Sequence, residues 1–254
     1  MCFDLDSQPP IQPIAGGALD QADLVLRAAD GNQFAAFRTR ASTPSGAGVV
    51  ILPDVRGLYS FYEELALRFA EAGVDALAID YFGRTAGLSK RDGDFSYMEH
   101  VQQTKLPELR ADVTVAAEEL RRDGRVRATF TMGFCFGGRL SYSSATFGLD
   151  LAGSIAFYGM PVGDRPGYPA PASVAPAMAS PILGLFGGAD QAISAESIAE
   201  FEAALDAAKV DHELITYPDA PHSFFDRKAA DFAEAAADSW ARSLAFIAAR
   251  TPAA

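Results

Sequence analysis

Short apolar runs alternate along most of this chain with segments in which apolar residues recur every three or four positions. A short apolar run suits a strand that is buried on both faces of a sheet, and the wider spacing suits an amphipathic helix. The apolar runs lie at 48–53, 74–80, 126–132, 152–159, 182–188 and 212–218. Helical segments lie at 60–73, 107–124, 194–209 and near the C-terminus, and a short one starts at about residue 139. The alternation predicts an α/β protein with a mostly parallel, twisted sheet that carries helices on both faces.

Three segments lack this alternation. Residues 1–22 contain many Pro, Gly and Gln residues, which predicts an extended N-terminal arm before a single domain at 23–250. The segments 81–103 and 160–180 are polar or rich in Pro and Gly, and we interpret them as loops. Ser60 and Glu63 match the S-x-x-E capping box, so Ser60 is expected to cap the helix that follows.

The composition restricts the classes of function. With 21 Lys and Arg against 33 Asp and Glu, the formal net charge is −12, which disfavours binding to nucleic acid or to an anionic membrane surface. No run approaches the length of a membrane-spanning helix, and the N-terminus lacks the pattern of a signal peptide. The two cysteines, Cys2 and Cys135, form no metal-binding spacing. We expect a cytoplasmic protein that needs no metal or cofactor; the oligomeric state does not follow from the sequence.

Cys135 lies in the stretch GFCFGG, directly after an apolar run that is typical of a strand. A nucleophile on a sharp strand–turn–helix corner needs small residues two positions before and after it, and here these are Gly133 and Gly137. The following helix would direct its N-terminus toward the thiol, which favours a thiolate, and the backbone N–H of Phe136 would stabilise an oxyanion. The alternative is that Cys135 is an inert core residue.

Asp190 and His222 each follow a later predicted strand, in the order nucleophile–acid–histidine. Because the carboxyl ends of parallel strands meet at one edge of a sheet, this order predicts a Cys–His–Asp triad. The alternative for Asp190 is a helix cap, since a helix begins a few residues later. His100 and His212 are competing histidines, but only His222 comes after the last predicted strand.

Four pieces of the chain, in this order, resemble the dienelactone hydrolase family of the α/β-hydrolase fold. They are GFCFGGR (133–139), FYG (157–159), FGGAD (186–190) and PHSF (221–224). The first piece is specific, because most α/β hydrolases carry Ser at the position of the nucleophile. The resemblance runs from about residue 23 to residue 248. It implies a single α/β-hydrolase domain with a triad of Cys135, His222 and Asp190.

The resemblance also implies roles for residues around the triad. A second oxyanion donor would be the backbone N–H of Val55, in the loop after the run at 48–53. The family has a glutamate in that loop that holds the resting thiol, and this chain has Asp54, whose side chain is one methylene shorter. Asp54 is therefore a candidate for orienting the thiol. Tyr158, in the FYG piece, is a candidate for substrate binding.

Members of the family bind a substrate carboxylate with two arginines. Arg84, in YFGRTAG, resembles the first. The second position, four residues after the histidine, is occupied by Asp226, which would repel a carboxylate, and Arg227 follows it. Arg56, beside the oxyanion loop, is a candidate substitute. The alternative for each arginine is a solvated surface charge.

The sequence thus predicts a carboxylic ester hydrolase, similar to carboxymethylenebutenolidases, that cleaves a small ester or lactone through a thioester on Cys135. A broad carboxylesterase or a thioesterase of the same fold is the first alternative. A non-catalytic thiol sensor or ligand-binding protein is the second, because a reactive thiol alone is enough for sensing. The presence of both Asp190 and His222 favours the enzyme.

Overall fold

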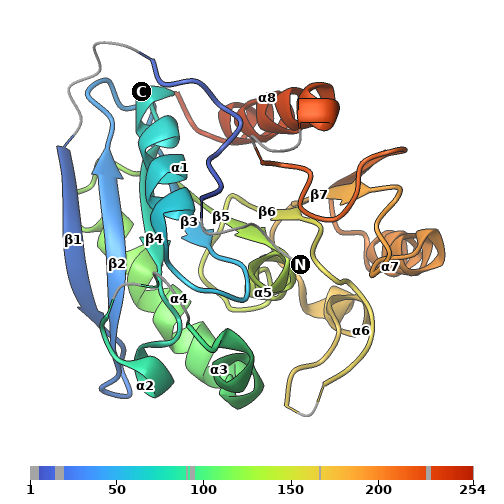
Figure 1. Ribbon diagram of the computed structural model, residues 1–254, viewed down its shortest axis with the longest axis horizontal. Coiled ribbons are helices and arrows are strands. Elements are labelled where there is room, and N and C mark those ends of the chain that lie inside the picture. Colours follow the sequence, from blue (N-terminus) through green and yellow to red (C-terminus); the bar gives the residue numbers. More distant parts are fainter. Residues whose placement is uncertain are drawn as a thin grey trace.

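The architecture is built on one sheet in the computed structural model, which describes residues 6–14, 20–89, 91, 95–165, 167–226 and 230–253. Within these residues the sheet has eight strands in the order β1-β2-β4-β3-β5-β6-β7-β8 (Figure 1). The strands are β1 Asp20–Arg27, β2 Gln33–Arg40, β3 Ala47–Leu52, β4 Asp75–Ile79, β5 Ala128–Phe134, β6 Gly153–Phe157, β7 Ile182–Gly187 and β8 His212–Tyr217. β2 pairs antiparallel with β1 and β4, and every pair from β4 to β8 is parallel.

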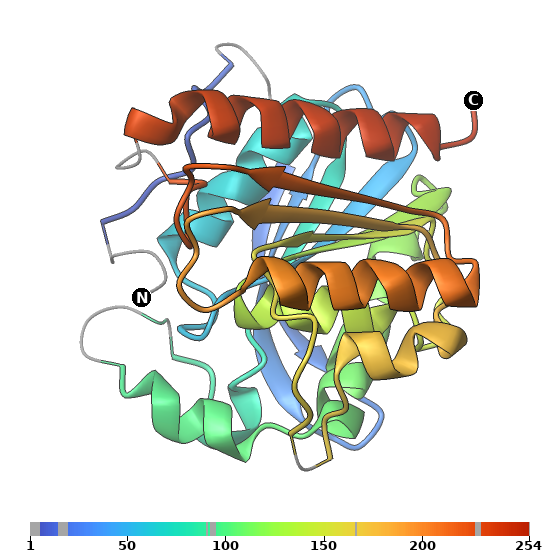
Figure 2. The same ribbon diagram turned by 90° about the vertical axis from the view of Figure 1, so that its right-hand side faces the viewer.

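Helices cover both faces of this sheet. The helices are α1 Ser60–Glu71, α2 Gly83–Ala86, α3 Tyr97–Gln103, α4 Leu106–Arg121, α5 Phe136–Ser144, α6 Pro171–Val174, α7 Ala195–Ala208 and α8 Ala233–Ala249, with short 3-10 segments at Ala175–Ala177 and Ala230–Phe232. In β3, Val49 and Ile51 pack with α1 and α8, whereas Val50 and Leu52 pack with α4 on the other face. Figure 2 shows α8 (red) and α7 (orange) on opposite sides of β7 and β8. Burial on both faces explains why the strands are continuous apolar runs.

The predicted fold class is confirmed, but four local predictions are wrong. Ser60 does not cap α1: the cap is Tyr59, and Ser60 is already in the first turn of the helix. The segment 81–103 contains α2 and α3, and the segment 160–180 contains α6. α5 begins at Phe136, directly after Cys135, rather than at about residue 139. No helix within the described ranges is long and apolar enough to cross a membrane.

The corner between β5 and α5 depends on close backbone packing. Cys135 has a φ of 54°, which is in the left-handed region that L-residues rarely adopt. A Cβ atom built on Gly133 would lie 1.9 Å from the carbonyl oxygen of Gly137, and a Cβ on Gly137 would lie 2.1 Å from the carbonyl oxygen of Leu52. Both contacts are with backbone, which cannot rotate away. The corner therefore forms only with glycine at these two positions.

We predict that Gly133→Ala lowers the free energy of unfolding by about 3 kcal/mol or more, because the new methyl group overlaps backbone atoms. Urea unfolding followed by the fluorescence of Trp240, the single tryptophan, measures the change. The matched control is Gly148→Ala, since Gly148 has a φ of 71° and open space around it. Its cost should be only the backbone strain, about 1–2 kcal/mol. Equal losses in the two variants would show that the close packing at the corner is unimportant.

Candidate active site

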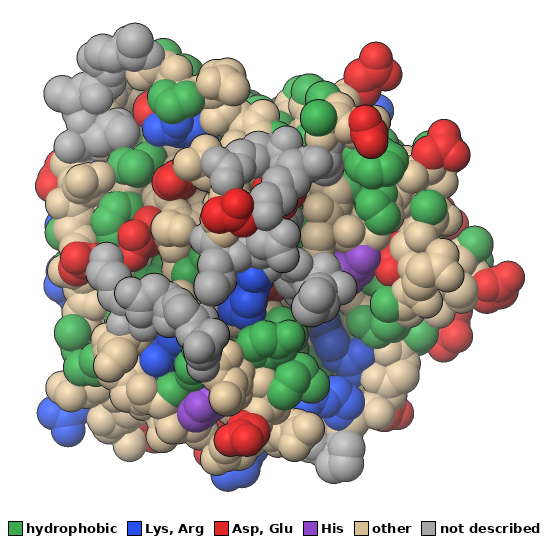
Figure 3. All heavy atoms as spheres, in the orientation of Figure 1, with side chains coloured by type: hydrophobic (Ala, Val, Ile, Leu, Met, Phe, Trp, Pro, Cys, Tyr) green, Lys and Arg blue, Asp and Glu red, His purple; other side chains and the backbone are tan. Residues whose placement is uncertain are grey.

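Loops at the carboxyl ends of β5, β7 and β8 meet at one cavity of about 610 Å³. Cys135 follows β5 directly, Asp190 follows β7, and His222 lies in the loop after β8. All three line the cavity, together with Tyr158, Arg139 and Arg165. Figure 3 shows a hollow on this side of the molecule, with basic side chains inside it and a histidine at its edge. The structure thus brings together three residues that the sequence predicts as a triad.

His222 and Asp190 form a short, well-shielded pair. The Nδ1 atom of His222 lies 2.6 Å from Oδ2 of Asp190, whose side chain is only 1% exposed. Asp190 Oδ1 accepts the backbone N–H of Ala192 at 2.8 Å, which fixes the carboxylate plane. Burial alone would raise the pKa of Asp190, but the hydrogen bonds from His222 and Ala192 outweigh it and lower the pKa. An ionised Asp190 holds the proton of the imidazole on Nδ1 and leaves Nε2 as the nitrogen that exchanges protons.

The contacts of Asp190 and of the competing histidines, His100 and His212, test their alternative interpretations. The N-cap of α7 is Ser194, whose side chain accepts the N–H of Ser197, so Asp190 does not cap that helix. The ring of His100 stacks on Phe95, with ring centroids 4.8 Å apart. His212 Nδ1 lies 2.8 Å from the carbonyl oxygen of Val210 at the start of β8. Among the three histidines, His222 is therefore the one that lines the cavity.

Cys135 is partly buried at the corner between β5 and α5. Its backbone N–H bonds the carbonyl oxygen of Phe157 at 3.0 Å, and its carbonyl oxygen accepts the N–H of Arg139 at 3.1 Å. Because α5 begins at the next residue, Cys135 stands at the N-terminus of that helix, where the first backbone N–H groups have no partner within the helix. Within the described residues, the thiol makes no hydrogen bond.

The loop after β3 packs against the corner between β5 and α5 (the elbow) and carries Asp54 and Val55. Asp54 is fully buried, and its carboxylate accepts the backbone N–H of Arg56 at 2.8 Å and the guanidinium of Arg56 at 3.1 Å. Burial raises the pKa of Asp54, against the opposing effect of Arg56. The hydroxyl of Tyr62 accepts the N–H of Asp54 at 2.8 Å, and the hydroxyl of Tyr81 donates to the carbonyl oxygens on either side of that N–H. These bonds fix the backbone next to Val55, while Asp54 is paired with Arg56 rather than with the thiol.

Comparison with known proteins shows the family. The sequence profile of the dienelactone hydrolase family matches residues 34–250. The chain belongs to the dienelactone hydrolase family. A Yersinia pestis protein named as a candidate carboxymethylenebutenolidase is 32% identical over 204 residues, covering 77% of this chain and 75% of that protein. A protein of the same designation from Escherichia coli K12 is 29% identical over 250 residues, covering 93% of this chain and 92% of that protein.

Solved structures show the same fold. A crystal structure of a candidate dienelactone hydrolase from Klebsiella pneumoniae is 26% identical, with a TM-score of 0.80 over 91% of this chain and 99% of that one. A dienelactone hydrolase-like promiscuous phosphotriesterase from metagenomic libraries is 23% identical, with a TM-score of 0.78 over 93% of this chain and 100% of that one. At that identity, the second likeness shows the fold alone.

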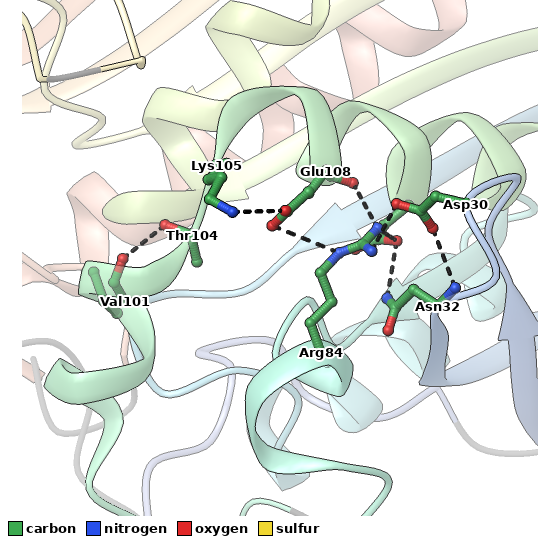
Figure 4. A network of polar contacts seen from close by, with 8 residues as sticks. Asp30, Asn32, Arg84, Val101, Thr104, Lys105 and Glu108 are labelled. Carbon is green, nitrogen blue, oxygen red and sulfur yellow. Dashed lines mark hydrogen bonds and ion pairs between the residues drawn. The ribbon is translucent and has the colours of Figure 1, made fainter.

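The arginines of this family member differ from the sequence expectation. Arg84 is held by Asp30 at 2.7 Å, by Asp112 at 2.9 Å and by the carbonyl oxygen of Glu108 at 3.2 Å (Figure 4). Among the described residues, neither Arg84 nor Arg56 lines the cavity, and Arg227 lies outside the described residues.

The cavity instead contains two arginines that the sequence analysis missed. Arg139 directly follows the stretch GFCFGG, and its position beside the predicted nucleophile was the available signal. Arg165 comes from the segment interpreted only as a loop, where nothing in the sequence marked it. Tyr158, a predicted substrate-binding residue, does line the cavity, and its ring lies 4.9 Å from that of His222. Within the described residues, no group of His, Cys, Asp and Glu is arranged to hold a metal ion.

The buried carboxyl group of Asp112, which pairs with Arg84, predicts a pH dependence of stability. Burial raises the pKa of Asp112 to about 6, against the opposing effects of Asn32 and Arg84. A carboxyl group whose pKa is raised on folding binds its proton more tightly in the folded state, so its contribution to stability falls as pH rises from about 4 to about 6. Asp112→Asn removes this titration. We therefore expect the variant to gain stability relative to the wild type, by up to about 3 kcal/mol, as pH rises through this window.

Urea unfolding of both proteins at several pH values between 4 and 7 measures this difference. If Arg84 dominated instead and lowered the pKa of Asp112, the wild type would gain on the variant as pH rises. A difference that is constant with pH would also contradict the prediction.

Proposed function

We propose that the protein hydrolyses small esters or lactones, with Cys135 as the nucleophile, His222 as the base and Asp190 as the residue that orients the base. The observation that supports it most is the 2.6 Å pair of His222 and Asp190 at the cavity that Cys135 also lines. Membership of the dienelactone hydrolase family supports a hydrolase. The backbone N–H groups of Phe136 and Val55 are the proposed oxyanion donors.

In the proposed first half-reaction, His222 Nε2 takes the proton of the thiol as sulfur attacks the ester carbonyl carbon. The carbonyl oxygen becomes an oxyanion, which the two backbone N–H groups stabilise. The carbon–oxygen bond to the leaving group then breaks, and the leaving oxygen takes the proton from His222. This leaves a thioester on Cys135. The thiol and the imidazole are not hydrogen-bonded in the resting structure, and such bonds tighten when substrate binds.

In the second half-reaction, His222 takes a proton from water as the water oxygen attacks the thioester. The carbon–sulfur bond breaks, and the leaving sulfur recovers the proton from the imidazolium. A thiolate leaves a tetrahedral intermediate more easily than an amine does, so an amide substrate would return to the starting state. We therefore propose esterase or lactonase activity with little amidase activity. Thioesters are the runner-up substrate class.

The cavity also favours substrates that carry an anionic group. The guanidinium of Arg165 lies over the rings of Phe136 and Tyr168, 6.0 and 5.9 Å from their centroids. Within the described residues the Arg165 side chain forms no ion pair, and its one hydrogen bond goes to the carbonyl oxygen of Val101 at 3.5 Å. Arg139, by contrast, donates to carbonyl oxygens of the 160–168 segment. We propose Arg165 as the residue that binds a substrate anion, such as the carboxylate that the name carboxymethylenebutenolidase implies for relatives.

Cys135→Ala should reduce turnover of p-nitrophenyl acetate by at least about 1,000-fold, because no nucleophile remains at the corner. Release of p-nitrophenolate measures this. The wild type, quenched during turnover, should carry one acetyl group on the peptide containing Cys135, and hydroxylamine should remove it. The control is Cys2→Ala, which replaces the other cysteine in the sequence and should leave turnover unchanged.

Turnover by Cys135→Ala close to the wild-type rate would refute the nucleophile. Alkylation of Cys135 by iodoacetamide in a protein that turns over no ester, lactone or thioester would instead support the thiol-sensor alternative.

Arg165→Gln should raise KM for an anionic ester, 4-acetoxybenzoate, about 10-fold or more, because a charge-assisted hydrogen bond to the carboxylate is lost. The KM for the neutral phenyl acetate should change by less than about twofold. Steady-state hydrolysis of both esters measures the two constants. Arg122→Gln is the control, since the Arg122 side chain is 71% exposed at the end of α4. An equal rise in KM for both esters would show that Arg165 shapes the cavity without binding charge.

A further inference from the structure

The loop that carries His222 is bonded at its far end to the N-terminal segment of the chain. Ser7 Oγ donates to Oδ2 of Asp226 at 2.7 Å, across 219 positions of sequence. Both residues are buried, with Ser7 2% and Asp226 7% exposed. A buried carboxylate needs hydrogen-bond donors. A hydrogen bond from a hydroxyl to a carboxylate stabilises the folded state more than a bond between two neutral groups does. The N-terminal segment therefore supplies part of the environment of the histidine loop.

Residues 6–14 are themselves fixed to the body of the protein. Pro9 is buried, and Ile11 packs against the larger hydrophobic cluster. The backbone N–H of Ile14 donates to Oε2 of Glu71 at 3.1 Å, at the end of α1. Figures 1 and 2 show this segment, in dark blue, running alongside α1. Ser7 is thus held in place independently of Asp226, so it can act as an anchor.

Asp226, the residue that Ser7 anchors, is four positions along the chain from His222. Between them, Phe224 and Phe225 are fully buried in the core, and Ser223 has a φ of 61°. The path from His222 to Asp226 therefore has little freedom, and a shift at Asp226 is transmitted to His222. The pair of His222 with Asp190 is only 2.6 Å long, so a displacement of a fraction of an ångström weakens it.

We infer that Ser7 is a positioning residue, which acts through Asp226 to hold His222 in its catalytic geometry. The inference rests on the proposed role of His222. It also gives a reason for an aspartate at position 226, where the family resemblance implies an arginine: the carboxylate is the acceptor that ties the histidine loop to the N-terminal segment. Residues 6–14 then belong functionally to the active site, although they precede the sheet.

The test is Ser7→Ala in the full-length protein. We expect kcat for p-nitrophenyl acetate to fall about 3- to 10-fold while KM stays within about twofold, because the base is displaced but the cavity is not. Ser7→Thr keeps the hydroxyl and should restore most of kcat. The control is Ser45→Ala. The hydroxyl of Ser45, just before β3, donates to the carbonyl oxygen of Gly73, and its removal should leave kcat unchanged.

A second measurement does not depend on turnover. Amide hydrogen exchange of the peptide 218–226 should be faster in Ser7→Ala than in the wild type, and unchanged in Ser45→Ala. If the wild type hydrolyses no ester but exchange rises as expected, the proposed function fails while the anchor stands. The inference would be overturned if peptide 218–226 exchanged no faster in Ser7→Ala than in the wild type. It would also be overturned if Ser7→Ala lowered kcat and Ser7→Thr did not restore it.

Discussion

Cys135 holds a φ of 54° at the corner between β5 and α5, a conformation that costs a non-glycine residue on the order of 1–3 kcal/mol. The corner is maintained because close backbone packing around it excludes other conformations of the chain. Gly133 and Gly137 pack backbone against backbone, and the carbonyl oxygens of Leu52 and Pro53 lie where a side chain of Gly137 would be. The same contact brings the loop after β3 against the elbow. One strained residue therefore determines where the thiol, the start of α5 and the loop of Val55 lie relative to one another.

The order of the strands determines what else the thiol can meet. β5 and β8 are separated by β6 and β7, which is about 14 Å at the usual spacing of strands. The loop after β8 must therefore return across β7 for His222 to approach the elbow. It does so over Gly187 and Gly188, where added Cβ atoms would lie 2.3 and 2.4 Å from the carbonyl oxygens of Ala220 and Pro218. The bond between His222 and Asp190 is short, and burial of the Asp190 side chain shields it from solvent; that bond sets the tautomer which the proposed chemistry needs.

The parts of the fold that follow from local pattern could be predicted from the sequence. A strand buried on both faces is a continuous apolar run, and a residue that follows such a run comes to the edge of the sheet; Cys135, Asp190 and His222 are brought to one cavity in this way. α3 was not predictable, because only Val101 of its seven residues is buried and no periodic stripe marks it. Arg84 could not be assigned from its motif either. Its partners Asp30 and Asp112 come from a hairpin and from α4, and only the folded chain shows that they hold the guanidinium.

Two aspartates stand where the resemblance to the family implies other residues, and each has a partner from the chain itself. Asp54, a candidate for orienting the thiol, is buried and forms an ion pair with Arg56, a candidate for substrate binding. Asp226 is bonded to Ser7. In both places a carboxylate has a structural partner, so neither is available to attract or repel a substrate at close range. Any preference of the cavity for anions then depends on Arg165, which comes from the segment after β6 and has no acidic partner among the described residues. In the proposed function, the elbow and the loop of His222 are held by packing at the edge of the sheet, whereas Arg165, the residue proposed to bind the substrate anion, lies in the segment between β6 and β7.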